Sequence, residues 1–445
     1  MLRRPAAAIV FAATALYAAV WSALGMWRYA NFRASRDDGL FTQVLSSAFS
    51  GFHATPEWNF NHFATHFSPA LYLIAPLLIA THRAVTLIVV QAIAGALVAP
   101  ALYLIARRRM PELAAAGCAV VALLYPALAG VTFTDFHESG FEPAAIVWLL
   151  WAIDAKKRWF SLGFGLFALG IKEDVAPGLF FGGVLGGLWL ARLGDARRSR
   201  YAFGLAAGAA VVFFGYLQLL RPALHAPFPY QQFRYYTGDG ASPFAPGAAV
   251  SRLRYVAVML LPLGFVPLLN PAVVLALPGL AEVLASRDPI TMSLETHYAA
   301  PWIGYLLFAF VLGIGMLYRR NPRNAEYALA ACAAISLYVL VHVDPLARWY
   351  SLYRLPNAHD ATLQAMLDAL PPDAAISAPD RIYAHLGFDP AAGVDAGGRF
   401  VIIDRTDHDV TPVWAQYENE LPGLVSTGKY RLVRAVDGIE LYEKV

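Results

Sequence analysis

The chain has 445 residues, of which 58% are hydrophobic and only 15% are charged. A soluble globular domain is roughly half apolar and about a quarter charged. This composition excludes an ordinary soluble protein and predicts an all-α polytopic membrane protein. The formal net charge of +3 is too small to indicate a partner. Cys118 and Cys332 lie inside apolar runs and support neither a disulfide framework nor a zinc site.

Eleven apolar runs are counted as predicted membrane spans. The first follows Arg3 and Arg4, and its length, with no small-residue cleavage site after it, predicts an uncleaved span rather than a secretory signal. Several runs are shorter than the roughly 20 residues that a perpendicular helix needs. The runs lie near residues 6–27, 84–106, 113–131, 143–155, 159–171, 174–191, 201–220, 254–269, 271–285, 299–318 and 325–343.

Basic residues in the connections predict the orientation of the chain. Counting eleven spans places every basic cluster on the same side, which the positive-inside rule makes cytoplasmic. The N-terminus is therefore expected inside and the C-terminus outside. The clusters are Arg3–Arg4, Arg107–Arg109, Lys156–Arg158, Arg192 with Arg197, Arg198 and Arg200, and Arg319–Arg320 with Arg323.

The first outer loop, residues 28–83, is large and rich in aromatic residues. Its apolar segment 69–80 is short and contains proline, and counting it as a span would move the arginines at 107–109 to the outside. We therefore expect a juxtamembrane helix that lies on the outer face.

The composition changes after Leu355. This change divides the chain into a predicted transmembrane domain at 1–350 and a small extracytoplasmic α/β domain at 355–445. An amphipathic helix is expected over 358–370, and Asp437-Gly438 is a hairpin signal between two strands. The strands are predicted at 374–378, 400–404, 430–434 and 439–443.

The ionisable residues that the positive-inside rule does not explain share the predicted outer face. Inserting a charged side chain at the bilayer centre costs roughly 2.5–3.5 kcal/mol of free energy, so a position near the water interface is the most favourable for these groups. That cost does not explain why acidic and imidazole groups gather outside, and we interpret them as a candidate site. They are Asp37, Asp38, His62 and His66 in the first outer loop, Asp135, His137 and Glu138 in the second, Lys172, Glu173 and Asp174 at an outer turn, and His297 with Tyr298 at the start of the tenth span.

Each cluster also has a structural interpretation. Asp38 precedes Gly39 and is placed to cap a helix that runs to about Phe49. His62 and His66 stand four residues apart, a spacing that metal sites use, although two histidines alone are weak evidence. The polar run at 135–138 is equally an ordinary turn between spans, and the charges at 172–174 partly neutralise one another.

A series of short polar motifs occurs in a fixed order along the chain. They are Asp38-Gly39-Leu40-Phe41 with Gln43, His66-Phe67-Ser68-Pro69, Gln91, Asp135-Phe136-His137, Lys172-Glu173-Asp174, His297-Tyr298 and Leu370-Pro371-Pro372-Asp373-Ala374. Together they resemble an uncharacterised bacterial membrane family, the domain of unknown function 2079, over nearly the whole chain. No single motif is specific, but the ordered set is. Glu138 departs from the proline expected at its position, which leaves the local turn open.

That family is in turn similar to the C-type (GT-C) glycosyltransferases, polytopic enzymes that use polyprenyl-phosphate sugars. Their plan of a cytoplasmic N-terminus, a large first outer loop and an early acidic residue fits the predicted topology. The resemblance implies that Asp38, or its neighbour Asp37, is the general base that deprotonates an acceptor hydroxyl. It also implies that Lys172, together with His66 or His137, offsets negative charge on the donor phosphate as it leaves.

The resemblance also assigns the remaining residues, the cofactor, the partners and a location in the cytoplasmic (inner) membrane of a bacterium. Roles in orienting the acceptor or holding a divalent cation (Mg or Mn) fall to Glu173, Asp174 and Asp135. Substrate contacts are also expected from Gln43, His297 and Tyr298, and the candidate metal ligands are His62, His66, Glu173 and Asp174. The expected partners are a polyprenyl-phosphate sugar donor, membrane lipid, and a lipid, glycan or protein acceptor, and no nucleic acid is expected.

Two other functions stay open. A proton-coupled secondary transporter would also use membrane carboxylates and histidines, but carriers place them near the midplane between two similar halves, and no such symmetry is found. A non-catalytic scaffold that presents the outer domain to a partner leaves the charges at 172–174 without a role. We therefore rank glycosyl transfer first, on fold-level analogy.

Overall fold

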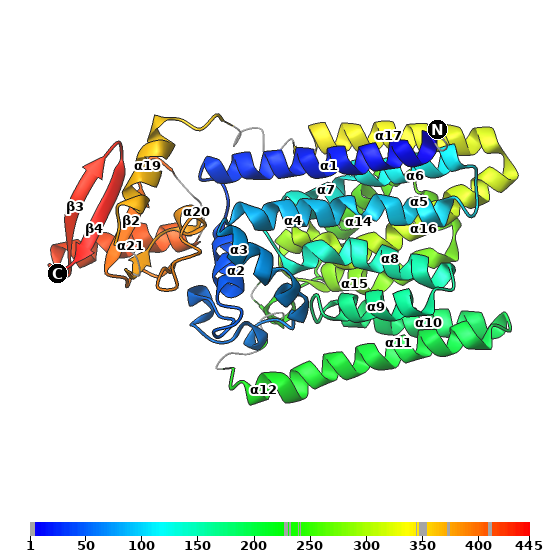
Figure 1. Ribbon diagram of the computed structural model, residues 1–445, viewed down its shortest axis with the longest axis horizontal. Helices are drawn as coiled ribbons and strands as arrows, with labels where there is room; N and C mark the ends of the chain where they lie inside the picture. The colour runs from blue at the N-terminus through cyan, green and yellow to red at the C-terminus, as the bar shows by residue number, and fades with distance from the viewer. Residues whose placement is uncertain are drawn as a thin grey trace.

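Apolar helices form most of the chain in the computed structural model (Figure 1). The structure describes residues 5–226, 230, 233–238, 240, 242–343, 345–346, 354–371, 374–407 and 412–445. Within these ranges six helices are long and apolar enough to cross a membrane, and a seventh span results if one bent pair is counted. The chain is therefore a multi-pass membrane protein. The basic residues Arg3 and Arg4 lie outside the described residues.

The long spans coincide with six of the predicted runs. Two of them combine consecutive elements: α4 continues directly into α5, and α11 continues through a π turn into α12. The spans are α1 (Pro5–Ala30), α4 with α5 (Val85–Ala96, Val98–Ala106), α10 (Val175–Arg192), α11 with α12 (Ala196–Gly215, Arg221–Ala223), α16 (Ala300–Arg320) and α17 (Pro322–His342).

A proline bends the seventh apolar segment. α6 (Glu112–Leu124) and α7 (Pro126–Phe133) meet at 51°. Pro126 has no N–H to continue the helix, and it forces the preceding Tyr125 into an extended conformation at ψ 120°. The segment predicted as one straight run at 113–131 is thus a broken one.

The other four predicted runs form shorter helices, so the count of eleven spans is not confirmed. Two of these helices have 13 residues, one has 12 and one has nine. Prolines at 262, 267 and 271 replace the expected continuation of two runs with 3-10 turns. The four helices are α8 (Glu142–Asp154), α9 (Arg158–Leu169), α14 (Ala248–Leu260) and α15 (Leu277–Ala285).

The predicted first outer loop, residues 28–83, contains two short helices, α2 (Arg36–Ser46) and α3 (Ala75–Thr81). The segment predicted as a juxtamembrane helix forms a 3-10 turn at Pro69–Leu73 followed by α3. The predicted cap at Asp38 is wrong, because α2 begins at Arg36 and Asp38 lies within its first turn. The helix also ends at Ser46, before Phe49.

A four-stranded sheet lies near the C-terminus, in the order β1-β2-β4-β3. β1 and β2 are parallel, and the other neighbours are antiparallel. The predicted turn at Asp437-Gly438 is present, with φ of 52° and 80°, as a two-residue hairpin turn requires. The strands are β1 (Ile376–Ser377), β2 (Phe400–Asp404), β3 (Tyr430–Val436) and β4 (Ile439–Lys444).

Three helices accompany this sheet, namely α19 (Ala358–Asp368), α20 (Asp380–Tyr383) and α21 (Pro412–Ser426). Only the first of them was predicted, and Pro372 and Asp373 of the predicted motif lie outside the described residues. Together these elements pack at one end of the helix bundle, on the side where α2 and α3 lie (Figure 1).

Gln43 of α2 joins the two parts of the molecule. Its Nε2 donates to the carbonyls of Asp389 and Ala392 at 2.6 and 2.9 Å, and its Oε1 accepts from the Tyr383 hydroxyl at 2.8 Å. The approach of α2 to α20 is so close that a Cβ on Gly39 would lie 2.6 Å from the Tyr383 carbonyl oxygen. α2 is therefore fixed between the sheet region and the bundle.

Candidate functional site

Arg28, at the end of α1, holds α2 against the loop at residues 134–138. Its guanidinium lies 2.8 Å from Asp135 Oδ1 and 3.8 Å from Asp38 Oδ2. Asp38 Oδ1 also accepts the Phe136 N–H at 2.8 Å. Burial and the neighbouring Asp135 raise the pKa of Asp38 to about 7, against the opposing effects of Arg28 and the Phe136 N–H. Asp38 is thus an interior contact between two loops, with only 2% of its surface exposed.

Asp37 points toward a different group of side chains. Its Oδ2 lies 3.1 Å from His137 Nε2, and 31% of its side chain is exposed. The His137 ring packs on His297, with 3.5 Å between ring centroids. Burial would raise the pKa of Asp37, but the charge and hydrogen bond of His137, with Arg36 and Arg234, lower it overall. Asp37 is therefore an accessible carboxylate next to two imidazoles.

Gln91 of α4 shapes the loop that carries Asp135 and His137. Its Nε2 donates to the carbonyl of Thr134 at 3.1 Å, and its Oε1 accepts the His137 N–H at 2.9 Å. Gln91 is 1% exposed, so these bonds are made in the interior. The loop conformation is therefore fixed by a side chain from a neighbouring span.

Glu173 connects the turn after α9 to two other segments. Its Oε1 lies 2.8 Å from His66 Nδ1 and accepts the Tyr230 hydroxyl at 2.6 Å, while its Oε2 accepts the Phe67 N–H at 2.7 Å. Burial opposes ionisation, but the charge and hydrogen bond of His66, with Lys172, lower the pKa of Glu173 to about 2. Glu173 is therefore a buried carboxylate with both oxygens bonded.

Lys172 is surrounded by carboxylates. Its Nζ lies 3.2 Å from Asp174 Oδ2 and 3.7 Å from Glu138 Oε1, and only 4% of the residue is exposed. Burial would lower the pKa of Lys172, but the surrounding carboxylates, Asp174 first, raise it well above its usual value. Neither carboxylate oxygen of the nearby Glu142 has a hydrogen bond to any described residue. Lys172 is thus surrounded by more carboxyl groups than its single ammonium can pair with.

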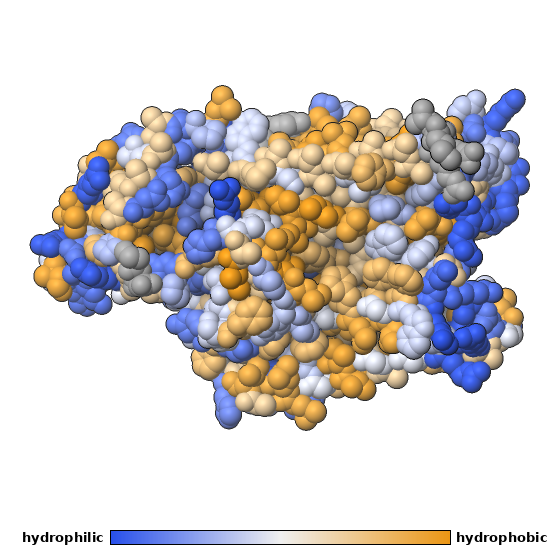
Figure 2. Space-filling view, viewed as in Figure 1, coloured by the Kyte–Doolittle hydropathy of each residue, from blue (hydrophilic) through white to orange (hydrophobic). Residues whose placement is uncertain are grey.

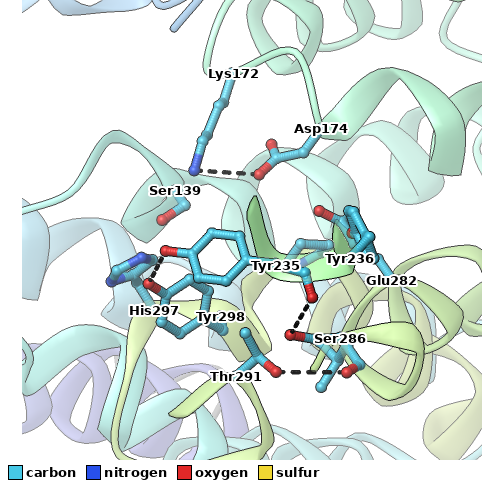
Figure 3. A pocket seen from close by; sticks show the side chains of 12 residues that line it. Ser139, Lys172, Asp174, Tyr235, Tyr236, Glu282, Ser286, Thr291, His297 and Tyr298 are labelled. Atoms are coloured by element: carbon cyan, nitrogen blue, oxygen red, sulfur yellow. Dashed lines mark hydrogen bonds and ion pairs between the residues drawn. The ribbon is translucent and has the colours of Figure 1, made fainter. Parts of the chain in front are cut away.

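A small cavity of about 30 Å³ brings these groups together (Figure 3). Lys172, Asp174 and Ser139 lie on one side of it, while His297, Tyr298 and Tyr235 lie on the other. The hydroxyls of Tyr235 and Tyr298 are 2.6 Å apart, and Arg234 donates to the Tyr235 hydroxyl at 3.0 Å. His297, which packs on the Asp37 partner His137, and the ammonium of Lys172 therefore border one polar cavity.

The candidate metal ligands are occupied by other partners. His62 Nδ1 lies 2.9 Å from Glu57 Oε2, and His66 and Asp174 are paired with Glu173 and Lys172 as described above. Across the described ranges, no three His, Cys, Asp or Glu side chains are grouped as a metal site requires. These residues, as placed, do not fit a divalent cation.

One predicted residue, Gln43, lies away from the cavity, and several residues around the site were not predicted. Gln43, which was expected to bind substrate, is 3% exposed. Its side-chain amide is hydrogen-bonded to α20 and the residues after it, as described above. Arg28 and Arg234 were not predicted to belong to the site. Both are basic residues on the predicted outer side, a weak signal that they share with Arg33, Arg36, Arg83 and Arg221. Glu57, Tyr230 and Tyr235 carry no such signal.

Comparison with known proteins gives one family and one fold. A family model described as "Predicted membrane protein (DUF2079)" matches residues 28–419. None of the curated proteins matches the sequence. Two solved structures of ArnT from Cupriavidus metallidurans, one bound to undecaprenyl phosphate and one in the apo state, are similar in fold with a TM-score of 0.55 and 13% identity. The alignments cover 97% of this chain and 98% and 97% of the ArnT chains. The chain therefore belongs to the DUF2079 family of predicted membrane proteins, and its fold is similar to that of ArnT.

Proposed function

We propose that the chain is a membrane glycosyltransferase that takes a sugar from a polyprenyl-phosphate donor on the extracytoplasmic face. The observation that carries the proposal is a series of polar contacts at the end of the bundle: the accessible Asp37 carboxylate meets His137, which packs on His297. His297 in turn lines the polar cavity together with the buried ammonium of Lys172. The ArnT structure bound to undecaprenyl phosphate supports a polyprenyl-phosphate ligand for this fold.

Asp37 is the better-placed general base of the two neighbouring aspartates. Its side chain is 31% exposed beside the histidines, whereas Asp38 is buried against Arg28 and the Phe136 N–H. In the proposed step the acceptor hydroxyl oxygen forms a bond to the anomeric carbon, and its proton passes to the Asp37 carboxylate. The bond between that carbon and the phosphate oxygen breaks, and the polyprenyl phosphate leaves with the electron pair.

Positive charge for the departing phosphate is assigned to Lys172 and Arg234. Lys172 borders the cavity, but Asp174 and Glu138 already share its charge. Arg234 is exposed, and its electrostatic effect reaches Asp37. Arg234 thus supplements Lys172, with His137 or His66 as further donors, and stabilises the charge that develops as the phosphate leaves. Glu173 and Asp135 act as positioning residues through their bonds to His66 and Arg28.

The proposal includes the orientation predicted from the basic clusters. The N-terminus would be cytoplasmic, the short helices α8, α9, α14 and α15 would complete eleven crossings, and residues 355–445 would form an extracytoplasmic domain beside the cavity. Contacts from α2 to α20 place that region next to the site-bearing loops, where a cover over the acceptor side is expected.

The test is consumption of lipid-linked sugars by purified protein in liposomes, using a panel of polyprenyl-phosphate sugars with membrane extract as acceptor. Wild type is compared with Asp37→Asn, Asp38→Asn and Lys172→Ala. Asp395→Asn, an exposed aspartate near the sheet, is the matched control. Turnover by wild type and control, abolished in Asp37→Asn and reduced in Lys172→Ala with unchanged thermal unfolding, would support the proposal.

A different result would overturn the proposal in favour of transport. No donor would be consumed by wild type, and the same liposomes would show proton-coupled solute uptake that Asp37→Asn abolishes. Greater loss in Asp38→Asn than in Asp37→Asn, at equal stability, would reassign the base within a transferase.

A further inference from the structure

A second cavity lies between helices α8, α9 and α11. Its volume is about 670 Å³, far larger than that of the polar cavity. Apolar side chains line most of its length, among them Leu149, Leu162, Leu166 and Leu205. The cavity is thus a largely apolar groove between α8, α9 and α11.

Basic side chains gather at one end of this groove. Lys156, Arg158, Arg197, Arg198 and Arg200 line it, against the single acidic residue Asp195. Asp195 is paired with Arg198 at 2.5 Å. The other four basic residues have no carboxylate partner in the described part of the chain. Figure 2 shows hydrophilic side chains concentrated at this end of α10 and α11. The end of the groove therefore carries uncompensated positive charge.

Glycines keep the groove open. Gly204 and Gly208 of α11 line it four residues apart, and a Cβ at either position would meet no atom within 4 Å. Glycine within a helix costs about 1 kcal/mol relative to alanine, and neither position is explained by close packing. Across from these glycines, on α9, a Cβ on Gly165 would meet Leu205 of α11 at 3.2 Å. The two helices are in contact at this point, and Gly165 forms the floor of the groove. The space above α11 is available to an occupant from the membrane.

We propose that this groove binds an anionic phospholipid, with the phosphate at the basic end and an acyl chain along α9. Charge complementarity selects an anionic headgroup, and the apolar walls select a ligand with a hydrocarbon chain. α9 has 12 residues and is about 18 Å long, close to the roughly 15 Å of one hydrocarbon leaflet. A soluble phosphate would use only the basic end. The site does not depend on the proposed glycosyl transfer, because its basic, headgroup-binding end lies at the opposite end of α9 from Lys172.

The test is native mass spectrometry of the full-length protein with dioleoyl phosphatidylglycerol and dioleoyl phosphatidylcholine, which share their acyl chains. Two groove variants are compared: Arg197→Gln with Arg200→Gln for charge, and Gly204→Leu for space. Their matched controls are Arg319→Gln with Arg320→Gln, exposed arginines at the end of α16, and Gly186→Leu, a helix glycine with open space outside the groove. A water-soluble glycerol phosphate in excess serves as competitor.

We expect wild type and both controls to retain phosphatidylglycerol at least about fivefold more than phosphatidylcholine. The charge variant should lose that selectivity, Gly204→Leu should lose retention of both lipids, and glycerol phosphate should displace neither. Equal selectivity in the groove and control variants would mean general attraction of anionic lipids to the surface, and it would overturn the proposal. Displacement of lipid by glycerol phosphate would also overturn it, in favour of a soluble phosphate ligand.

Discussion

His66 Nδ1 lies 2.8 Å from Glu173 Oε1, and this contact joins the first outer loop to the turn between α9 and α10. The Tyr230 hydroxyl donates to the same oxygen at 2.6 Å, so a third segment meets at one buried carboxylate. Glu173 is fully buried, and an ionised group there requires such partners. The pair therefore determines how the segments around the polar cavity are held together.

Replacing Glu173 with glutamine should destabilise the protein by about 2 kcal/mol, because the amide NH₂ must face one of three donors that now bond the carboxylate. Thermal unfolding in detergent measures the loss, with Glu420→Gln, an exposed residue of α21, as the control. Because the pKa of Glu173 is lowered in the folded protein, its contribution to folding stability is present above about pH 4.3 and is lost as the pH falls toward about 2. Equal unfolding midpoints for variant and wild type at neutral pH would contradict the central position of Glu173.

Asp38→Asn should have a pH-dependent effect on stability. Burial and Asp135 raise the pKa of Asp38 to about 7, above the roughly 3.9 of an unfolded chain, so the native state binds this proton more tightly. Native stability therefore falls as the pH rises from about 4 to about 7, and asparagine, which does not titrate, avoids that loss. Relative to wild type, the variant should gain about 1–2 kcal/mol between about pH 5 and about pH 8, measured by thermal unfolding. Asp395→Asn should show no such trend. A stability difference between Asp38→Asn and wild type that stays constant across this pH range would contradict the raised pKa of Asp38.

The polar residues that the sequence singled out gather at one end of the bundle, but the sequence did not predict which of them contact one another. Apolar runs and basic clusters follow directly from the cost of burying charge in a bilayer, so the long spans and the end that carries the polar groups were predictable. The opposite orientations of Asp37 and Asp38 were not, because they depend on Arg28 and Phe136, which come from other segments. Similarly, the partners of Gln43 are backbone carbonyls more than 340 positions away in the sequence.

Local sequence also failed where proline breaks an apolar run. The residues at 254–285 are apolar enough to indicate spans, but prolines at 262, 267 and 271 remove backbone donors and produce 3-10 turns instead. The strand at 400–404 was predicted with its bounds, because a fully buried run of β-branched and aromatic residues has few alternatives. By contrast, α20 is too short to produce a periodic pattern.

Gly130 of α7 should not tolerate a side chain. A Cβ at this position would lie 1.7 Å from the Leu294 carbonyl oxygen, in the loop that leads to His297. Gly130→Ala must therefore push that loop away and should cost about 1–3 kcal/mol. Gly163→Ala in α9 is the matched control, because a Cβ there meets no atom within 4 Å and alanine favours the helix by up to about 1 kcal/mol. Thermal unfolding should separate the two variants in opposite directions, and similar midpoints would show that the loop adapts without strain.

His137→Gln should change the pH dependence of turnover more than it changes stability. The His137 charge and hydrogen bond lower the pKa of Asp37, so a neutral glutamine should let that pKa rise. Asp37 would then be protonated at a higher pH, and the acidic limb of kcat/KM against pH should move upward for a reaction that needs its carboxylate. His342→Gln, an exposed histidine at the end of α17, should leave the profile unchanged. A profile whose amplitude falls while its acidic limb stays in place would show that His137 acts only on the donor phosphate and does not set the charge of Asp37.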